Sequence, residues 1–440
     1  MRKTSEGNRW ALSSPRGGGP RSESTPGALG SGGRDVVLEI VIPAILLVLA
    51  FDFFNGFHDA ANAIATIVAT KVLTPTKAVA MAAVGNFVGM VFITNAIAET
   101  IGKGIVDTSV FLGAQFLQAM TIILAGVVGA IVWDLVTWWW GLPTSSSHAL
   151  IGGLIGSTIL AGGVGAILVP APENLFLFFA LTGIAFLAGV VGVLGFSIAR
   201  REPVTLGAIL LAGLFTGLLP SIVLGRIYLK GIVQVVVFMV AAPFIGLTFS
   251  FLFTLIVMRL ERRTSPSKIN HHFRRLQLLS SFFYSVTHGT NDAQKGVGII
   301  TLILIIASIG PPWGPEAGQF HVPFWAILGA HASISIGTLL GGWRIVRTMS
   351  QRVTALRPYQ GFCAETGGGI ALAGTALAGI PVSTTHVIAS AIMGVGATRR
   401  LSAVRWGVAR RIVWAWVLTI PASAGVAAVV YAVARIALGL

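Results

Sequence analysis

The sequence predicts an all-α polytopic membrane protein built from two homologous halves. Three observations indicate this class. The 440 residues are 55% hydrophobic and only 10% charged, with a mean hydropathy of +0.85, whereas soluble domains carry roughly 25% charged residues. Apolar runs near the ~20 residues that cross a bilayer as a helix recur from Asp35 onward. Two polar motifs each occur twice, in the same order.

The apolar runs indicate about ten to twelve helical segments, some too short or too broken to cross a membrane alone. Examples are "VVLEIVIPAILLVLAF" from Val36 and "FLQAMTIILAGVVGAIVW" from Phe116. No long hydrophilic stretch leaves room for a second domain, so we expect one membrane-embedded bundle.

The formal net charge of +15 indicates membrane topology and no nucleic-acid partner. Basic residues gather in short loops, at 259–275, 344–357 and 399–411, and such loops lie on the cytoplasmic side. Residues 1–34 are basic and rich in Gly, Ser and Pro, which is typical of a disordered tail, and no cleavable signal peptide is expected. Cys363 is the only cysteine, so neither an intrachain disulfide nor a thiolate metal site is expected.

Two motif pairs indicate the duplication. "NGFHDAANAIATI" from Asn55 matches "HGTNDAQKGVGII" from His288, and "GLPTSSSHALIGG" from Gly141 matches "GIPVSTTHVIASA" from Gly379. Asp292 follows Asp59 by 233 residues, and Pro381 follows Pro143 by 238. The expected organisation is a tail at 1–34, a first transmembrane repeat at 35–258, a basic cytoplasmic linker at 259–275 and a second transmembrane repeat at 276–440. Such duplication is typical of secondary transporters, whose site lies between the halves. Whether the halves are parallel or inverted is left open by the segment count.

The hydroxyl motif predicts a helix that begins inside the membrane. A Gly-x-Pro break in an apolar helix is tolerated only where the freed backbone groups are buried in protein or face water. Proline favours the first helical turn, and the Ser and Thr residues that follow are good N-caps. The free N–H groups and positive dipole end then form an anion site. The hydroxyl donors are Ser145, Ser146, Ser147, Ser383, Thr384 and Thr385.

Two such helix starts that face each other would hold a tetrahedral oxyanion. The alternative is that the hydroxyls bond back to their own helix or pack against neighbours. His148 and His386 follow the hydroxyls in both copies, and we expect them to brace the hairpin through a backbone carbonyl rather than to contact substrate.

The acidic motif places Asp59 and Asp292 within apolar runs. An ionisable residue inside a span marks an ion path or a substrate site by default; the alternative is a carboxylate held by a partner only for packing. Because carboxylates repel an oxyanion, a cation or proton must lie between them, as in a symporter.

The two acidic motifs differ at one informative position. Asn62 could give a carbonyl oxygen to Na⁺, but Lys295 stands opposite it and has only donors. Lys295 would fill a cation position or exchange a proton with Asp292, unless it reaches out to a membrane interface. The hypothesis is coupling to H⁺ rather than Na⁺.

At these four motifs the chain resembles the PiT family of inorganic phosphate transporters, most closely its bacterial low-affinity branch. The resemblance covers nearly all of the chain after the tail. It implies inverted repeats with about twelve helical segments and re-entrant broken hairpins, a multi-pass protein of the bacterial plasma membrane, and a homodimer. It also implies import of phosphate, free or as a neutral divalent metal complex, with H⁺ or Na⁺ and without a cofactor or resident metal.

The family pattern places phosphate at the hydroxyl and acidic motifs. The matched positions are Asp59, Asn62, Ser145, Ser146, Asp292, Asn291, Ser383 and Thr384. His58 and Lys295 depart from the asparagines usual in sodium-coupled members, which favours H⁺.

Three rival functions stay open at this point: a symporter for sulfate or another oxyanion, a channel, and an intramembrane hydrolase that uses either Ser145 with His148 or an aspartate dyad. The duplicated layout argues against an enzyme, because catalysis needs one site and no oxyanion-hole motif accompanies the pair. The roles of Glu99 and Glu365 are left open; an isolated glutamate near a helix end is more often an interfacial cap than a ligand.

Overall fold

The computed structural model describes residues 31–112, 114–200, 206–311, 314–316 and 319–440. The chain divides into two compact units, residues 1–40 and 41–440, and everything below on packing and the site concerns the second. In the first unit, the described residues 31–40 are helical. The predicted tail lies outside the described residues up to position 30, and the first helix begins at Ser31.

Helices make up nearly all of the described structure, and the described residues contain no β-strand, only an isolated bridge between Val106 and Ile167. In chain order the elements are α1 (Ser31–Ala69), α2 (Pro75–Val88), η1 (Gly89–Phe92), α3 (Ala96–Lys103), α4 (Ser109–Leu112), α5 (Phe116–Trp140), α6 (Ser146–Gly162), η2 (Val164–Ala166), α7 (Pro172–Arg200), α8 (Leu206–Tyr228), α9 (Gly231–Leu260), α10 (Pro266–Ile306), α11 (Phe324–Leu340), α12 (Trp343–Arg347), η3 (Thr348–Arg352), α13 (Pro358–Leu377), α14 (Thr384–Ala397), η4 (Leu401–Ala403) and α15 (Trp406–Leu438).

Seven of the described helices are long and apolar enough to cross a membrane, by length and composition. An eighth span is the pair α11 and α12–η3, which is bent by 62° at a short break. Four further helices add to these spans: the more polar α10, then α13, and the short apolar α6 and α14. The described segments then number about twelve, in agreement with the sequence prediction. The chain is therefore an all-α multi-pass membrane protein.

Two helical hairpins carry the hydroxyl motifs. Gly141 after α5 and Gly379 after α13 have φ of 65° and 68°, the left-handed region that glycine adopts readily at the end of a helix. The prolines that follow cannot continue the helix, so at both places the chain turns and starts a new helix. The returning helix α6 packs between α5 and α15, and α14 packs between α9 and α13. Their first turns are buried.

The helices that carry the acidic motifs, α1 and α10, run antiparallel. Ser281 donates to the carbonyl oxygen of Ala63 at 3.3 Å. One end of the pair is fixed by Thr70, which donates to Gln277 Oε1 at 2.9 Å. At the other end the carboxyl group of Asp52 lies against Gly296. Corresponding helices of inverted repeats have this relation, although inversion of the whole halves stays a prediction.

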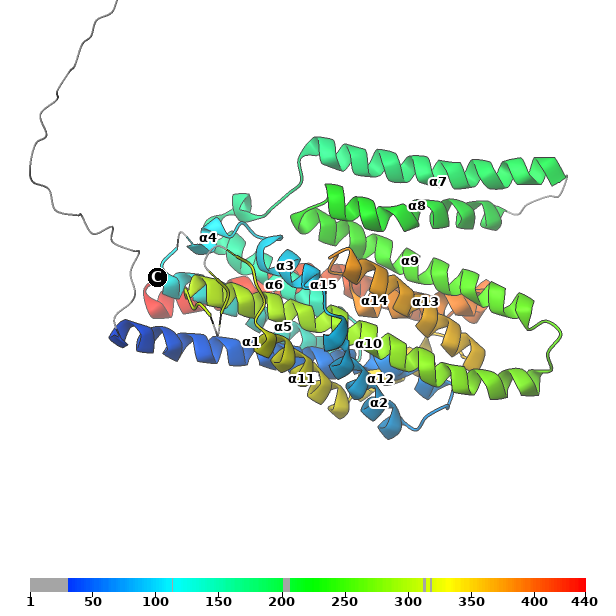
Figure 1. Ribbon diagram of the computed structural model, residues 1–440, viewed down its shortest axis with the longest axis horizontal. Coiled ribbons are helices and arrows are strands. Elements are labelled where there is room, and N and C mark those ends of the chain that lie inside the picture. Colours follow the sequence, from blue (N-terminus) through cyan, green and yellow to red (C-terminus); the bar gives the residue numbers. More distant parts are fainter. Residues whose placement is uncertain (1–30, 113, 201–205, 312–313, 317–318) are drawn as a thin grey trace, which may run out of the picture. The chain divides into compact units, whose positions relative to one another are not determined.

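The α7–α8 hairpin packs mainly on itself and through α8 on α9 (Figure 1). Only 11% of the most apolar 18-residue stretch of α7 is buried, and large side chains such as Phe176, Ile184 and Val191 are exposed. An apolar surface of this kind suits contact with lipid.

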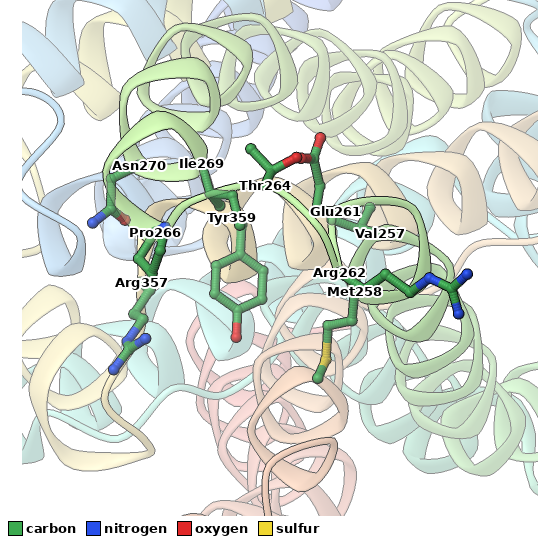
Figure 2. A pocket seen from close by; sticks show the side chains of 10 residues that line it. All are labelled: Val257, Met258, Glu261, Arg262, Thr264, Pro266, Ile269, Asn270, Arg357 and Tyr359. Carbon is green, nitrogen blue, oxygen red and sulfur yellow. The ribbon is translucent and has the colours of Figure 1, made fainter.

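The expected linker at 259–275 is mostly helical. α9 ends at Leu260, a turn follows, and Pro266 is the first residue of α10, as its missing N–H and fixed φ favour. A cavity of about 280 Å³ lies beside this turn (Figure 2). Its lining contains none of the four motifs and consists of Val257, Met258, Glu261, Arg262, Thr264, Pro266, Ile269, Asn270, Arg357 and Tyr359.

Candidate functional site

Both short helices begin inside the protein with the same cap. Ser145 precedes α6, and its hydroxyl oxygen accepts from the backbone N–H of His148 at 3.2 Å. Ser383 precedes α14 and accepts from the N–H of His386, also at 3.2 Å. The predicted half-helix starts are thus confirmed. Each capping hydroxyl still has its own hydrogen to donate. The first turn of each helix also keeps backbone N–H groups that have no acceptor within the helix.

The two acidic motifs meet at the start of α14. The Thr384 hydroxyl lies 3.1 Å from Asp292 Oδ2 and 3.4 Å from Asp59 Oδ2. The Thr385 hydroxyl lies 3.4 Å from the other oxygen of Asp59. All four side chains are buried. Because one hydroxyl has one hydrogen, Thr384 can donate to only one carboxylate at a time.

Lys295 connects this acidic pair to the other half-helix. Its ammonium donates hydrogen bonds to Asp292 and to Ser147, the second residue of α6. Its side chain is completely buried. The alternative that Lys295 reaches a membrane interface is therefore wrong, because the packing of α10 directs the side chain inward, where two acceptors satisfy it. The starts of α6 and α14 are joined to one cluster by Lys295 and Thr384.

Asn62 completes the cluster from α1. Its amide nitrogen donates to Thr385 Oγ1 at 2.9 Å and to Thr384 Oγ1 at 3.2 Å. Its carbonyl oxygen is buried and has no hydrogen-bond partner among the described residues. That oxygen is the atom expected as a cation ligand.

Two histidines flank the carboxylates. His58 Nδ1 lies 2.8 Å from Asp59 Oδ1, and its Nε2 lies 3.1 Å from Thr137 Oγ1. His288 Nε2 lies 3.2 Å from Asp292 Oδ2. Asp59, His288 and Asp292 offer ligand atoms within 4.8 Å of one another. Carboxylate and imidazole ligands suit a small cation or a shared proton, whereas the neighbouring Lys295 ammonium disfavours a divalent metal ion by repulsion.

Some expected site residues lie apart from the cluster. Asn291 is buried on α10, but its amide donates to the Leu372 carbonyl oxygen of α13 at 3.2 Å. Ser146 is the first residue of α6 and lies beside Asp134 of α5. The structure thus brings Asp59, Asn62, Asp292, Lys295, Ser147, Thr384 and Thr385 together, and places Ser145 and Ser383 at the helix caps.

Three further buried carboxyl groups were not assigned to the site by the sequence. Asp52 and Asp134 have 0% and 1% exposure; each is an ionisable residue in an apolar run, the signal that identified Asp59, but neither is duplicated. Glu365 is also fully buried, and it accepts from Thr66 at 2.6 Å, Gln277 at 3.1 Å and Ser280. Glu365 is therefore not an interfacial cap, because α13 turns it toward α1 and α10.

Glu99 behaves differently from Glu365. It is 45% exposed on α3 and pairs with Lys103 one turn later, at 2.8 Å. This position agrees with a surface role.

Comparison with known proteins agrees with this fold. The family model described as "Phosphate transporter family" matches residues 55–427. A protein of Rhizobium meliloti (strain 1021) named "Probable low-affinity inorganic phosphate transporter" is 41% identical over 392 residues, 89% of this chain and 96% of that protein. A Bacillus subtilis (strain 168) protein of the same name is 34% identical over 90% of this chain and 98% of its own.

One similar solved structure is described as "The sodium-dependent phosphate transporter". It superposes with a TM-score of 0.64 at 25% identity and covers 90% of this chain and 99% of its own. The family model spans most of the present sequence, and relatives above 30% identity match over almost their whole length. The chain belongs to the phosphate transporter family.

Proposed function

We propose that this protein is a secondary-active symporter that imports inorganic phosphate across a bacterial plasma membrane together with H⁺. The observation that carries the proposal is the joining of Asp59 and Asp292, one from each acidic motif, at Thr384. Because family members are transporters, the hydrolase alternative has no support.

The cluster has the donors that a phosphate ion needs. The first turns of α6 and α14 supply N–H groups and hydroxyls, and Lys295 supplies a positive charge beside Ser147. The carboxylates favour phosphate over sulfate, because phosphate keeps a proton near neutral pH and can donate it to a carboxylate. A neutral divalent metal–phosphate complex would reduce the repulsion further, and we propose it as a second substrate form.

The proposed coupling to H⁺ follows from Lys295. The ammonium already neutralises Asp292, so that this half of the site lacks the vacant oxygen ligands that Na⁺ requires. The similar solved structure is of a sodium-dependent transporter, and Asn62 keeps a carbonyl oxygen of the kind that Na⁺ binds. Lys295 is the residue of this chain that favours H⁺.

The proposed cycle uses the two half-helices as a clamp. Phosphate and its coupling proton enter together, and the starts of α6 and α14 close on the anion. The halves then rock around the site and release both to the cytoplasm. We propose a homodimer, with one complete cluster in each chain.

Uptake of labelled phosphate into proteoliposomes tests this function, with pH and sodium gradients imposed separately and sulfate added as competitor. We expect uptake to follow the pH gradient and to resist excess sulfate. Uptake that follows only the sodium gradient would refute proton coupling, and equal inhibition by sulfate would refute phosphate selectivity.

Variants of the two aspartates test the site itself. Asp59→Asn and Asp292→Asn should each abolish uptake without preventing membrane insertion, and Glu173→Gln, at an exposed position of α7, is the matched control. Full activity in either aspartate variant would reject the proposed role.

A further inference from the structure

Asp52 is a carboxyl group that the proposed cycle does not yet use. It has 0% exposure, and neither of its oxygens has a hydrogen-bond partner among the described residues. It lies on α1 two helical turns before Asp59, or about 10 Å along the axis. A buried carboxylate without donors is strongly disfavoured, so in this conformation the group is expected to carry a proton.

Gly296 of α10 provides the space for this carboxyl group. A Cβ atom at Gly296 would lie 2.1 Å from Asp52 Oδ2 and 2.3 Å from Oδ1, closer than any side chain allows. Asn55, one turn further along α1, is also fully buried, and both its amide nitrogen and its oxygen lack partners among the described residues. The carboxyl group of Asp52 thus lies against the backbone of α10, and Asn55 adds a buried amide with unused hydrogen-bonding capacity one turn further along α1.

The charged groups that act on Asp52 come from the candidate site. They are Asp292 and Lys295 of α10, and Lys295 directly precedes Gly296 in the chain. On α11, which packs against this part of α1 through Gly337 and Phe53, the only titratable side chain is His331. Its Nδ1 lies 3.0 Å from the Ile327 carbonyl oxygen of its own helix. The Lys295 ammonium is therefore the cation for which an ionised Asp52 would compete.

We propose that Asp52 is a second proton-binding carboxyl group, which controls phosphate affinity through Lys295. When Asp52 is protonated, its neutral acid group leaves the Lys295 ammonium with Asp292 and Ser147 at the phosphate site. When the O–H bond of Asp52 breaks and the proton passes to water, the carboxylate attracts the ammonium, and phosphate loses that charge. Proton binding outside thus strengthens phosphate binding, and proton release inside weakens it, as reciprocal linkage requires.

This inference rests on the proposed coupling to H⁺, and the two can fail separately. If the wild-type protein shows no pH-driven uptake, both the proposed coupling to H⁺ and the proposed role of Asp52 are refuted. Wild-type protein with pH-driven uptake leaves the role of Asp52 to be decided by its variants.

Asp52→Asn fixes the neutral form and is the first test. We expect exchange of external labelled phosphate for internal phosphate to stay within about twofold of wild type, while accumulation driven by a pH gradient falls at least about tenfold. The change in phosphate affinity between acidic and alkaline buffer should be smaller in the purified variant than in wild type. Undiminished pH-driven accumulation overturns the inference, and so does loss of exchange in a correctly inserted variant.

Gly296→Ala tests the same contact while retaining the acid. The added methyl group displaces the Asp52 carboxyl group, so we expect an altered pH dependence of phosphate binding. Gly192→Ala on α7, where an added Cβ meets nothing within 4 Å, is the matched control. A pH profile identical to wild type in Gly296→Ala overturns the inference even if Asp52→Asn fails to insert.

Discussion

The imidazole rings of His148 and His386 lie edge to face, with their centroids 4.8 Å apart. Each histidine is the third residue of its half-helix, so the contact joins equivalent positions of the two hydroxyl motifs. His386 also stacks on Trp416 of α15 at 3.9 Å. These histidines were expected to brace the hairpins through a backbone carbonyl; what the structure shows is a direct ring contact between the two half-helices.

Substitutions at His148 and His386 should lower the stability of the protein, and their effects should not be additive. His148→Ala and His386→Ala each remove the contact, and an aromatic pair contributes about 0.5–1.5 kcal/mol beyond area burial. We expect the double variant to be less destabilised than the sum of the two single variants. Thermal unfolding of the purified proteins measures this, with His148→Phe as a variant that retains a ring. Strict additivity would show that the contact contributes nothing.

Removal of the Thr384 hydroxyl should reduce transport more than it reduces folding. A hydrogen bond to a charged group contributes about 1.5–3 kcal/mol, so Thr384→Ala is expected to lower initial phosphate uptake by about tenfold or more. Thr384→Ser keeps the hydroxyl and should retain most activity. Thr182→Ala serves as control, because that hydroxyl bonds only carbonyl oxygens of its own helix, α7. Equal rates in Thr384→Ala and wild type would contradict the role.

Replacement of Lys295 should change the response to cations. Lys295→Asn removes the ammonium and supplies a carbonyl oxygen next to Asp292, which gives the second half a ligand type suited to Na⁺. We expect a weaker response of uptake to a pH gradient and a new stimulation by a sodium gradient. Parallel proteoliposome assays with the two gradients measure both effects. An unchanged cation dependence would show that Lys295 does not decide coupling.

Substitution of Glu365 should lower the stability of the protein, and the loss should depend on how many hydrogen-bond acceptors the new side chain retains. Glu365→Ala leaves the donors of Thr66, Gln277 and Ser280 without their acceptor, at about 1–3 kcal/mol for each one that stays buried. Glu365→Gln retains one acceptor and should be the milder change. Thermal unfolding distinguishes the two variants.

The control for Glu365 is Glu99→Ala. Glu99 takes part in an exposed ion pair with Lys103, and such pairs contribute about 0–1 kcal/mol. A loss of stability in Glu365→Ala no larger than in Glu99→Ala would mean that the buried hydrogen bonds add little.

The sequence predictions were most accurate for features that depend on residues close together in the chain. The start of each half-helix follows from a glycine in the left-handed region, a proline and a capping serine, all within a few residues. Asp59 and Asp292 were identified because a charge inside an apolar run and its repetition are visible in the sequence alone. The role of Glu365 could not be predicted, because a single glutamate near a helix end gives no sign of which helix it will face.

The sequence by itself determined the membrane class, the repetition of the two motifs, the two half-helices and the acidic pair, because composition, spacing and capping act along the chain. Tertiary structure decided where the remaining polar side chains point. Lys295 meets Ser147 across 148 residues, Thr66 meets Glu365 across 299, and Asp52 lies against Gly296. These contacts depend on how α1, α6, α10 and α13 pack, since a buried polar group takes whichever partner the neighbouring helices bring to it.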